Sequence, residues 1–430
     1  MTEYLKQAPL YSEQVSAQVR DTVSEMLARI ERDREQAIRH YSRELDKWDP
    51  PSFRVDAATI ERAAAEVDEE LKQHIVFAQT QVRSFAQAQR DTMRDLEVET
   101  LPGVTLGHRH IPVQTAGSYV PGGRYPMLAS SFMTVIVPKV AGVDRVVACA
   151  PPRAGAGIHP EMLYAMSTSG ADDILALGGV QAMAAMVHGI EDIPPADIIV
   201  GAGNAYVAEA KRQLFGEAGI DLLAGPTEVA IIADHTADPE LVALDLLGQA
   251  EHGPTSPAVL ISTDRALGEA VLAQIERLLP TYPTREVAGA AWEAHGSIAI
   301  VDGHEQAIAL SDEIASEHLE VQVEDSMLEA YRLRLRNYGS LFLGREATVA
   351  YGDKGVGTNH VLPTQRAARY TGGLWVGKFL KTCTWQRLTA EGTAQVAPAI
   401  AAISHAEMLE GHALTAEYRL QSLAEGASAR

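Results

Sequence analysis

The sequence has few cysteines, no long apolar run and no excess of basic residues, and each absence argues against a class of protein. Two cysteines in 430 residues are too few for a disulfide framework and fit a reducing compartment. No apolar run approaches the roughly 20 residues of a membrane-spanning helix, and the first residues lack the pattern of a secretory signal. A formal net charge of −21 disfavours nucleic acid, whose phosphates need a basic surface. We therefore expect a cytoplasmic protein with neither a membrane nor a nucleic-acid partner.

What the chain contains is an alternation of helical and strand-like patterns. Residues 11–95 are rich in Ala, Glu, Gln and Arg and predict helices. From about residue 104, short β-branched runs alternate with helical patterns; the runs are TVIVPKV, DRVVACAPP, DDILALGG, ADIIVGAGN, TEVAIIAD, PAVLIST, GSIAIVDG and GSLFLG. This alternation is typical of βαβ units with largely parallel sheets. Because eight strands exceed one comfortable sheet, we predict two related α/β domains, followed after about residue 375 by a helical end.

Three segments beside predicted strands have both a ligand-binding and a structural interpretation. GAGNAY, residues 201–206, follows a strand and opens a helix, but Tyr206 replaces the third glycine of a dinucleotide fingerprint. In YVPGG, residues 119–123, two glycines permit close approach to a ligand or simply a turn. Cys149 could be the nucleophile of an aldehyde-oxidising enzyme, but a small apolar residue ending a buried strand is the better interpretation.

Side chains able to bind a metal occur in four polar pairs. They are Gln249 and His252 in LLGQAEHGP, Glu317 and His318 in SEHLE, Asp353 and His360 in GDKGVGTNH, and Glu407 and His412 in AEMLEGH. The first pair is spaced i, i+3, so both should project from one helix face. We expect the third pair in a glycine-rich loop and the fourth, spaced i, i+5, on the last helix. Each could be an ordinary surface or core residue, but together they supply the nitrogen and oxygen ligands that zinc accepts.

Many motifs, in order from about residue 105 to 420, resemble the histidinol dehydrogenase family. They are AGSYVPGGRYP, LGGVQAMAA, GAGNAYVAEAKRQ, DLLAGPTEVAIIAD, LLGQAEHGP, SEHLE, GTNHVLPT and a closing ExxxxH. The resemblance implies two incomplete Rossmann-like domains in an intertwined homodimer with shared active sites. The implied division is a helical arm at 1–18, a discontinuous first domain at 19–118 and 229–373, a second domain with the NAD site at 119–228, and a helical tail at 374–430.

The same resemblance implies a four-electron oxidation of a primary alcohol, through an aldehyde, to a carboxylate, with two NAD+ used in turn. One zinc ion per subunit would be held by Gln249, His252, Asp353 and His412 of the partner subunit. His318 would act as the base, and Glu317 would activate water. The NAD site would contain Tyr119, Gln181 and Asn204. Glu251 should point away as a capping or surface carboxylate, and no catalytic cysteine is needed.

The substrate is the open question. The implied substrate-binding residues are Thr227, Gln249, His252, His318, Asp353, His360, Glu407 and His412. Thr227 stands where serine is usual in the family, and Lys378 stands where biosynthetic members typically carry an acidic residue. Further cations lie at Arg124 and Arg369. Such cations would disfavour cationic histidinol and favour an anionic alcohol, unless they are solvated or paired with carboxylates.

Four segments are similar to one subgroup of the family, the NAD-dependent sulfopropanediol 3-dehydrogenases. They are GHRHIPV, PGGRYP, AYGDKGVGTNH and ARYTGGLWVGKFLKTCT. This similarity implies oxidation of (R)-2,3-dihydroxypropane-1-sulfonate to (R)-sulfolactate, a step of organosulfonate catabolism. In that case Lys378 is a candidate contact for the sulfonate. Oxidation of L-histidinol to L-histidine is the alternative, and another small polar alcohol stays open.

Overall fold

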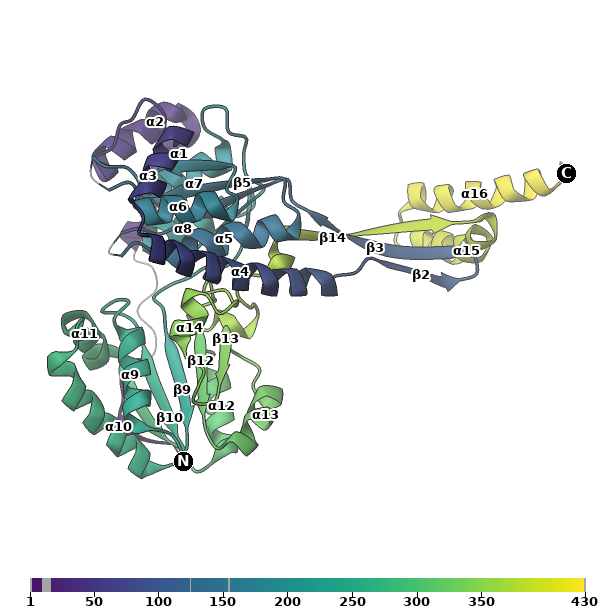
Figure 1. The fold of residues 1–430 in the computed structure, drawn as a ribbon. Coiled ribbons are helices and arrows are strands. Elements are labelled where there is room, and N and C mark those ends of the chain that lie inside the picture. The colour runs from purple at the N-terminus through teal and green to yellow at the C-terminus, as the bar shows by residue number, and fades with distance from the viewer. Residues whose placement is uncertain (1, 10–16, 124, 154, 429–430) are drawn as a thin grey trace. The chain divides into compact units, whose positions relative to one another are not determined.

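The computed structural model describes residues 2–9, 17–123, 125–153 and 155–428, and it divides the chain into two compact units (Figure 1). The first unit comprises Met1–Gln89 and Val113–Phe379 and contains two sheets, one of five strands and one of six. The second comprises Arg90–Pro112 and Leu380–Arg430 and contains a three-stranded sheet and two helices. Among the described residues, no helix has the length and hydropathy needed to cross a membrane.

The five-stranded sheet is parallel throughout and has the order β6-β5-β4-β7-β8. Its strands are β4 (Thr115–Tyr119), β5 (Arg145–Ala150), β6 (Asp173–Ala176), β7 (Ile198–Val200) and β8 (Gly219–Ile220). The chain moves outward from β4 to β6 and then returns to the other side of β4 as β7. The loops after β4 and β7 therefore lie side by side at the carboxyl edge, where open α/β sheets usually bind ligands.

Helices enclose this sheet on both faces. One group is α1 (Ala17–Asp33), α2 (Glu35–Tyr41), α7 (Gly179–His188) and α8 (Ala205–Leu214), which share one apolar core with β4–β7. The other group is α5 (Leu128–Ala141) and α6 (Pro160–Ser169), with α3 (Ala57–Glu66) packed on α6 and α4 (Glu69–Thr92) bonded to it through Gln79. A π-helical turn, η1 (Ser42–Asp46), follows α2.

The six-stranded sheet has the order β1-β11-β10-β9-β12-β13, with β1 antiparallel at its edge and the other strands parallel. Its strands are β1 (Glu3–Lys6), β9 (Val229–Ala233), β10 (Ala258–Ser262), β11 (Gly296–Ile300), β12 (His318–Gln322) and β13 (Ser340–Leu343). One face, with Ile231 and Leu260, packs on α9 (Pro239–Ala250), α10 (Arg265–Leu278) and α11 (Arg285–His295). The other, with Ile232 and Val259, packs on α12 (His304–Ile314) and α13 (Asp325–Arg334). Shorter elements are η2 (Leu279–Thr281), α14 (Val349–Lys354), η3 (Ala367–Arg369) and η4 (Val376–Phe379).

The second unit has a thin core. Its sheet, in the order β14-β3-β2, is antiparallel and consists of β2 (Leu96–Leu101), β3 (Val104–Pro112) and β14 (Leu380–Leu388). Helices α15 (Ala390–Ala406) and α16 (Glu410–Ser428) pack on each other through small residues such as Ala397 and Ala416. All six residues of β2 are exposed, including Leu96 and Val98.

Two α/β subdomains with largely parallel sheets are present, as the alternation of patterns predicted. Two segments were assigned wrongly. TVIVPKV lies inside α5, because a segment that is buried along its length reads as a strand from its β-branched residues alone. KTCTWQRL, expected to be helical, forms most of β14, because it pairs along its whole length with β3. Such a partner distant in the sequence is invisible to local propensity.

The expected division of the chain also differs from the structure. Residues 19–118 were expected to belong with 229–373, but α1 and α2 pack with α7 and α8 on the five-stranded sheet. The first residues were expected to be a helical arm, but Glu3–Lys6 forms β1 and pairs with β11. Residues 10–16, within the predicted helical region, lie outside the described residues.

Candidate active site

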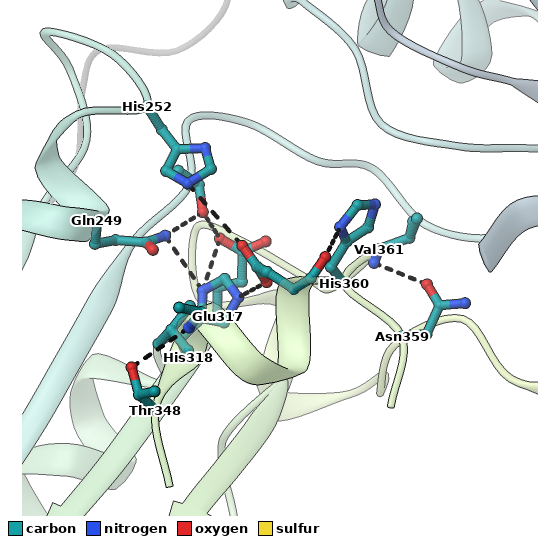
Figure 2. Close-up of polar contacts among 12 residues, drawn as sticks. Gln249, His252, Glu317, His318, Thr348, Asn359, His360 and Val361 are labelled. Carbon is teal, nitrogen blue, oxygen red and sulfur yellow. Dashed lines mark hydrogen bonds and ion pairs between the residues drawn. The ribbon is translucent and has the colours of Figure 1, made fainter. Parts of the chain in front are cut away.

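Polar side chains from four segments meet at the amino edge of the six-stranded sheet, next to the starts of β9 and β12 (Figure 2). Glu317 and His318 stand where β12 begins, and Thr227 lies just before β9. Gln249 comes from the last turn of α9 and Asp353 from α14. All but Thr227 are at most 6% exposed. The structure thus brings together most of the residues that the resemblance assigned to catalysis and metal binding.

Glu317 is held by two donors in a dry environment. The hydroxyl of Thr227 and the backbone N–H of Glu228 both donate to Oε2, at 2.5 and 3.0 Å. The amide nitrogen of Gln249 donates to the same hydroxyl. Burial raises the pKa of Glu317 to about 7, against the positive field of His318 and these hydrogen bonds. A carboxyl with this pKa can take and return a proton near neutral pH.

His318 lies between three acceptors. Its Nε2 is 3.2 Å from Asp353 Oδ1, and its Nδ1 is 3.1 Å from the carbonyl oxygen of Glu228. Desolvation lowers the pKa of His318, but Glu317 and Asp353 outweigh it and raise the pKa to about 9. The sequence shows Glu317 beside His318 but does not show Asp353 there, so it does not predict a pKa this high. His318 must lose the proton that faces Asp353 before it can act as a base.

Three of the expected zinc ligands gather beside His318. Asp353 turns Oδ1 to His318, while Oδ2 is 4.0 Å from His252 Nε2. The amide of Gln249 lies in the same cluster (Figure 2). Burial lowers the pKa of His252, which favours the neutral ring that a metal requires. An amide oxygen, an imidazole and a carboxylate fit zinc, whose tetrahedral ligands stand about 3.3 Å apart at bond lengths near 2.0 Å.

The local structure around these ligands differs from the predicted one in two details. Helix α9 ends at Ala250, so His252 lies in the turn that follows the helix. Asp353 belongs to α14 and not to a glycine-rich loop. Glu251 points away from the cluster, as predicted, and accepts a hydrogen bond from Thr284 at 2.9 Å.

His360 joins the two halves of the first unit. Its Nδ1 is 3.0 Å from the carbonyl oxygen of Asp353, and its Nε2 is 2.7 Å from the hydroxyl of Ser130 on α5. Burial lowers the pKa of His360, and a neutral ring satisfies both contacts, donating to the carbonyl and accepting from the serine. His360 therefore reaches the cluster through Asp353.

The segments expected to bind NAD lie at the carboxyl edge of the five-stranded sheet. Asn204 caps α8 and, with Thr227 and His252, lines a cavity of about 600 Å3. Gly201 has φ +114°, and a Cβ there would collide with the carbonyl oxygen of Tyr119, so the loops after β4 and β7 require glycine to approach. Its N–H donates to Asp221, which forms a buried ion pair with Lys211.

Tyr119 and Gln181 lie next to the turn at Gly178 and Gly179. The Tyr119 hydroxyl accepts from the N–H of Gly179 at 3.2 Å, and Gln181 Nε2 donates to Asp46 at 2.9 Å. Gln181 Oε1 is buried and has no hydrogen-bond partner in the described structure. Asp46, in η1, also accepts from the N–H of Gly178 at 3.3 Å, and burial raises its pKa. Sequence reasoning missed Asp46, because nothing in YSRELDKWDP marks a carboxylate that bonds Gln181 and Gly178.

The remaining predicted residues lie elsewhere. Glu407 directly follows α15, and His412 lies in the first turn of α16, both in the second unit. The prediction that both lie on the last helix is therefore wrong for Glu407. Lys378 is half-buried, donates to Thr371 at 2.9 Å and is absent from the lining of the 600 Å3 cavity. Arg369 ends η3, and Arg124 lies outside the described residues.

Cys149 is fully buried at the end of β5, as its structural interpretation predicted. Its thiol donates to the carbonyl oxygen of Leu177, and burial raises the pKa well above the ordinary range. A second buried glutamate, Glu228, escaped the sequence analysis. Burial and the neighbouring Glu317 raise its pKa to about 8, and its carboxylate accepts from the N–H of Gln365 at 3.1 Å.

Comparison with known proteins identifies the family. A sequence model of histidinol dehydrogenase matches residues 11–420. A histidinol dehydrogenase homolog of Shouchella clausii is 53% identical, covering 98% of this chain and 99% of its own. A sulfopropanediol 3-dehydrogenase of Ruegeria pomeroyi is 49% identical, covering 97% and 96%. The crystal structure of histidinol dehydrogenase from Elizabethkingia anophelis matches with a TM-score of 0.91 at 35% identity, covering 97% and 95%.

These matches confirm the family and the class of enzyme. The chain is an oxidoreductase that acts on a CH–OH group with NAD. It belongs to the histidinol dehydrogenase family, whose members oxidise an alcohol to an acid in a four-electron reaction and generally bind zinc.

Proposed function

We propose that the enzyme oxidises (R)-2,3-dihydroxypropane-1-sulfonate to (R)-sulfolactate. The observation that carries the substrate is the 49% identity, over nearly both full chains, to a sulfopropanediol 3-dehydrogenase. The match to the histidinol dehydrogenase of known structure is lower, at 35%. The reaction consumes one alcohol, two NAD+ and one water and yields a carboxylate, two NADH and three protons.

The buried pair at the start of β12 would do the proton chemistry. His318 removes the hydroxyl proton as hydride leaves the carbinol carbon for NAD+, giving the aldehyde. Glu317, held by Thr227, deprotonates the water that adds to that aldehyde. His318 then accepts the proton of the hydrate as the second hydride leaves. The pKa of Glu317, about 7, supports such repeated transfers, and His318 takes part once it has lost the proton that faces Asp353.

Gln249, His252 and Asp353 would hold zinc together with His412 of the partner subunit. Zinc, when bound, supplies a Lewis acid that fixes and polarises the substrate's hydroxyl oxygen. We place the NAD site in residues 119–228, with Tyr119, Gln181 and Asn204 as its contacts. Glu407 of the partner subunit would contact the substrate.

The homodimer is part of this proposal, since His412 and Glu407 belong to the second unit. That unit exposes an unusual number of large apolar side chains for its size. They are Leu96, Val98, Leu101, Leu106, Leu388, Ile400, Ile403, Met408, Leu409, Leu414 and Tyr418. Burying such surfaces against a second copy would remove apolar area from water.

L-histidinol is the second candidate, because the family's substrate positions Thr227, His360 and Glu407 are all occupied by residues that can bind it. The test is the yield of NADH from each alcohol with the zinc-loaded enzyme. Two NADH per sulfonate and none from histidinol is the expected result. Two NADH from histidinol alone would replace the proposal.

Lys378 tests how the anion is recognised. If its ammonium binds the sulfonate, Lys378→Met raises the KM for the sulfonate about ten-fold or more and leaves the KM for NAD+ unchanged. Lys381→Met, on the exposed part of β14, is the matched control. An unchanged KM for the sulfonate in Lys378→Met would show that Lys378 has a structural role and does not bind the substrate.

A further inference from the structure

Strand β12 carries a row of three buried polar side chains, and the proposed chemistry uses only the first, His318. Its sequence HLEVQ alternates polar and apolar residues, which usually marks a strand with one face in water. Here His318, Glu320 and Gln322 are only 1%, 0% and 3% exposed, while Leu319 and Val321 pack in the α12–α13 core. Burying such groups costs free energy unless each is hydrogen-bonded, so the row calls for a physical reason.

Two carboxyl groups form the centre of this row. Gln322 Nε2 donates to Asp245 Oδ2 at 2.9 Å and to Glu320 Oε2 at 3.0 Å, so one amide group holds both carboxyls. Two buried carboxyls held by the same amide disfavour each other's negative charge, so we infer that the pair shares one proton. Burial raises the pKa of both groups, that of Glu320 to about 8.

The surroundings of the pair hold no compensating cation. Among the described residues, no lysine or arginine bonds or ion-pairs with either carboxyl. The other polar contacts come from α14, where the Thr348 hydroxyl donates to Asp245 at 3.0 Å and the Val349 N–H donates to Glu320 at 2.9 Å. From the α11 side, the ionisable group that faces Asp245 is the phenol of Tyr282.

The pair joins the elements that carry the active site. Asp245 lies on α9 one turn before Gln249, so both project from the same side of the helix. Glu320 lies two residues after His318 and on the same face of β12. Val349 opens α14, which carries Asp353 four residues later. The two carboxyls therefore connect α9 and α14 to β12, at a position two residues further along the strand than His318.

We propose that Asp245 and Glu320 are positioning residues that hold α9 and α14 in register with β12. The inference rests on the proposed function, because the groups it positions are the proposed ligands Gln249 and Asp353 and the proposed base. A proton-sharing pair makes this connection without placing a cation beneath the metal site. A lysine at the same place would repel the zinc ion and oppose protonation of His318.

The test compares Glu320→Leu, which removes the connection, with Glu320→Gln, whose amide oxygen can still accept from the Val349 N–H but which cannot ionise. Gln79→Leu is the control, since Gln79 is a buried polar residue whose amide nitrogen bonds Ala165, Thr168 and Ser169 on α6. Zinc affinity, kcat, KM and melting temperature are measured on each full-length enzyme. Glu320→Leu should lower zinc affinity and kcat about ten-fold or more and leave the KM for NAD+ unchanged. Glu320→Gln should restore both to within about two-fold.

A second readout follows the shared proton itself. The folded pKa of Glu320, about 8, lies above the ordinary 4.5, so its stabilising effect is present below pH 4.5 and is lost as pH rises to about 8. As the pH is raised from 5 to 8, the melting temperature of Glu320→Gln should therefore increase relative to that of wild type. This measurement keeps the test decisive if the leucine variant does not fold.

Two results would overturn the proposal. The first is a Glu320→Leu enzyme that is less stable than wild type but has the zinc affinity and kcat of Gln79→Leu. The second is a melting-temperature difference between Glu320→Gln and wild type that does not change with pH. Failure of the proposed function gives a different result. In that case wild type itself binds no zinc or forms no NADH from either alcohol, while the melting comparison still reports on the carboxyl pair.

Discussion

The two sheets of the first unit present opposite edges to the functional region. The five-stranded sheet uses its carboxyl edge, where the loops after β4 and β7 place Tyr119 and Asn204. The six-stranded sheet uses its amino edge, where β9 and β12 begin beside Thr227 and Glu317. The 600 Å3 cavity is lined by residues of both halves. Open α/β sheets usually bind ligands at the carboxyl edge, so only the first half follows the common rule.

The two edges also differ in the ionisable side chains that they carry, and this difference suggests a separate role for each. The amino edge of the six-stranded sheet concentrates buried carboxyls and imidazoles whose pKa values are strongly shifted. The carboxyl edge of the five-stranded sheet offers glycines, Tyr119, Gln181 and a cysteine that stays protonated, with Asp46 reaching in from η1. We infer that one edge is built for proton transfer and metal binding, and the other for holding a dinucleotide.

The largest expected effect comes from removing the proposed base, His318, at the amino edge of the six-stranded sheet. His318→Asn should lower kcat for NADH formation about 1,000-fold or more, because general-base catalysis contributes on the order of 10²–10⁴. Initial rates of NADH formation measure the effect. The melting temperature is the control, and it should stay within a few degrees because asparagine can still donate one hydrogen bond. Turnover at the wild-type rate would remove His318 from this role.

The second effect concerns the proposed zinc ligand of the second unit, His412. His412→Ala should weaken zinc binding by roughly two orders of magnitude, since the metal would keep three of four protein ligands. Zinc content after dialysis against a weak chelator measures it. His405→Ala is the matched control, because His405 lies on the same helical hairpin and bonds Glu410 and Glu417 at 2.8 and 2.9 Å.

A mixed dimer tests which of the two subunits supplies His412 to a given active site. If the partner subunit supplies His412, then His318→Asn and His412→Ala chains, each inactive alone, should regain one intact site in each mixed dimer. Unchanged zinc content in His412→Ala, or mixed dimers that stay inactive, would contradict the shared site.

The third effect lies at the carboxyl edge and should change binding without changing chemistry. Asp46→Ala removes the acceptor for Gln181 and for the N–H of Gly178, so the KM for NAD+ should rise about ten-fold while kcat stays within two-fold. Asp49→Ala, on the exposed side of the same segment, is the control. An equal fall of kcat in Asp46→Ala would mean that this edge takes part in the chemistry.

Sequence reasoning predicted the class of fold because alternating strands and helices leave a strong pattern. It placed Gln249, His318 and Asp353 correctly in one cluster only through the family resemblance, since spacing cannot bring segments a hundred residues apart together. Local propensity failed at β14, which exists because β3 pairs with it. The carboxyl pair on β12 could not be predicted either, since the alternating polar residues of HLEVQ look the same in sequence whether they meet water or a buried partner.

The smallest expected effect tests whether Cys149, at the carboxyl edge of the five-stranded sheet, takes part in catalysis. Cys149→Ala should leave kcat within about two-fold and lower the melting temperature by a few degrees, because it deletes a buried sulfur and its hydrogen bond to Leu177. The wild-type enzyme should likewise keep its activity in iodoacetamide, since a thiol with a strongly raised pKa is a poor nucleophile. Cys383→Ala, at the exposed second cysteine, controls for reaction elsewhere. A loss of aldehyde oxidation in Cys149→Ala, with alcohol oxidation intact, would instead place covalent catalysis at this edge and reverse the assignment of tasks to the two sheets.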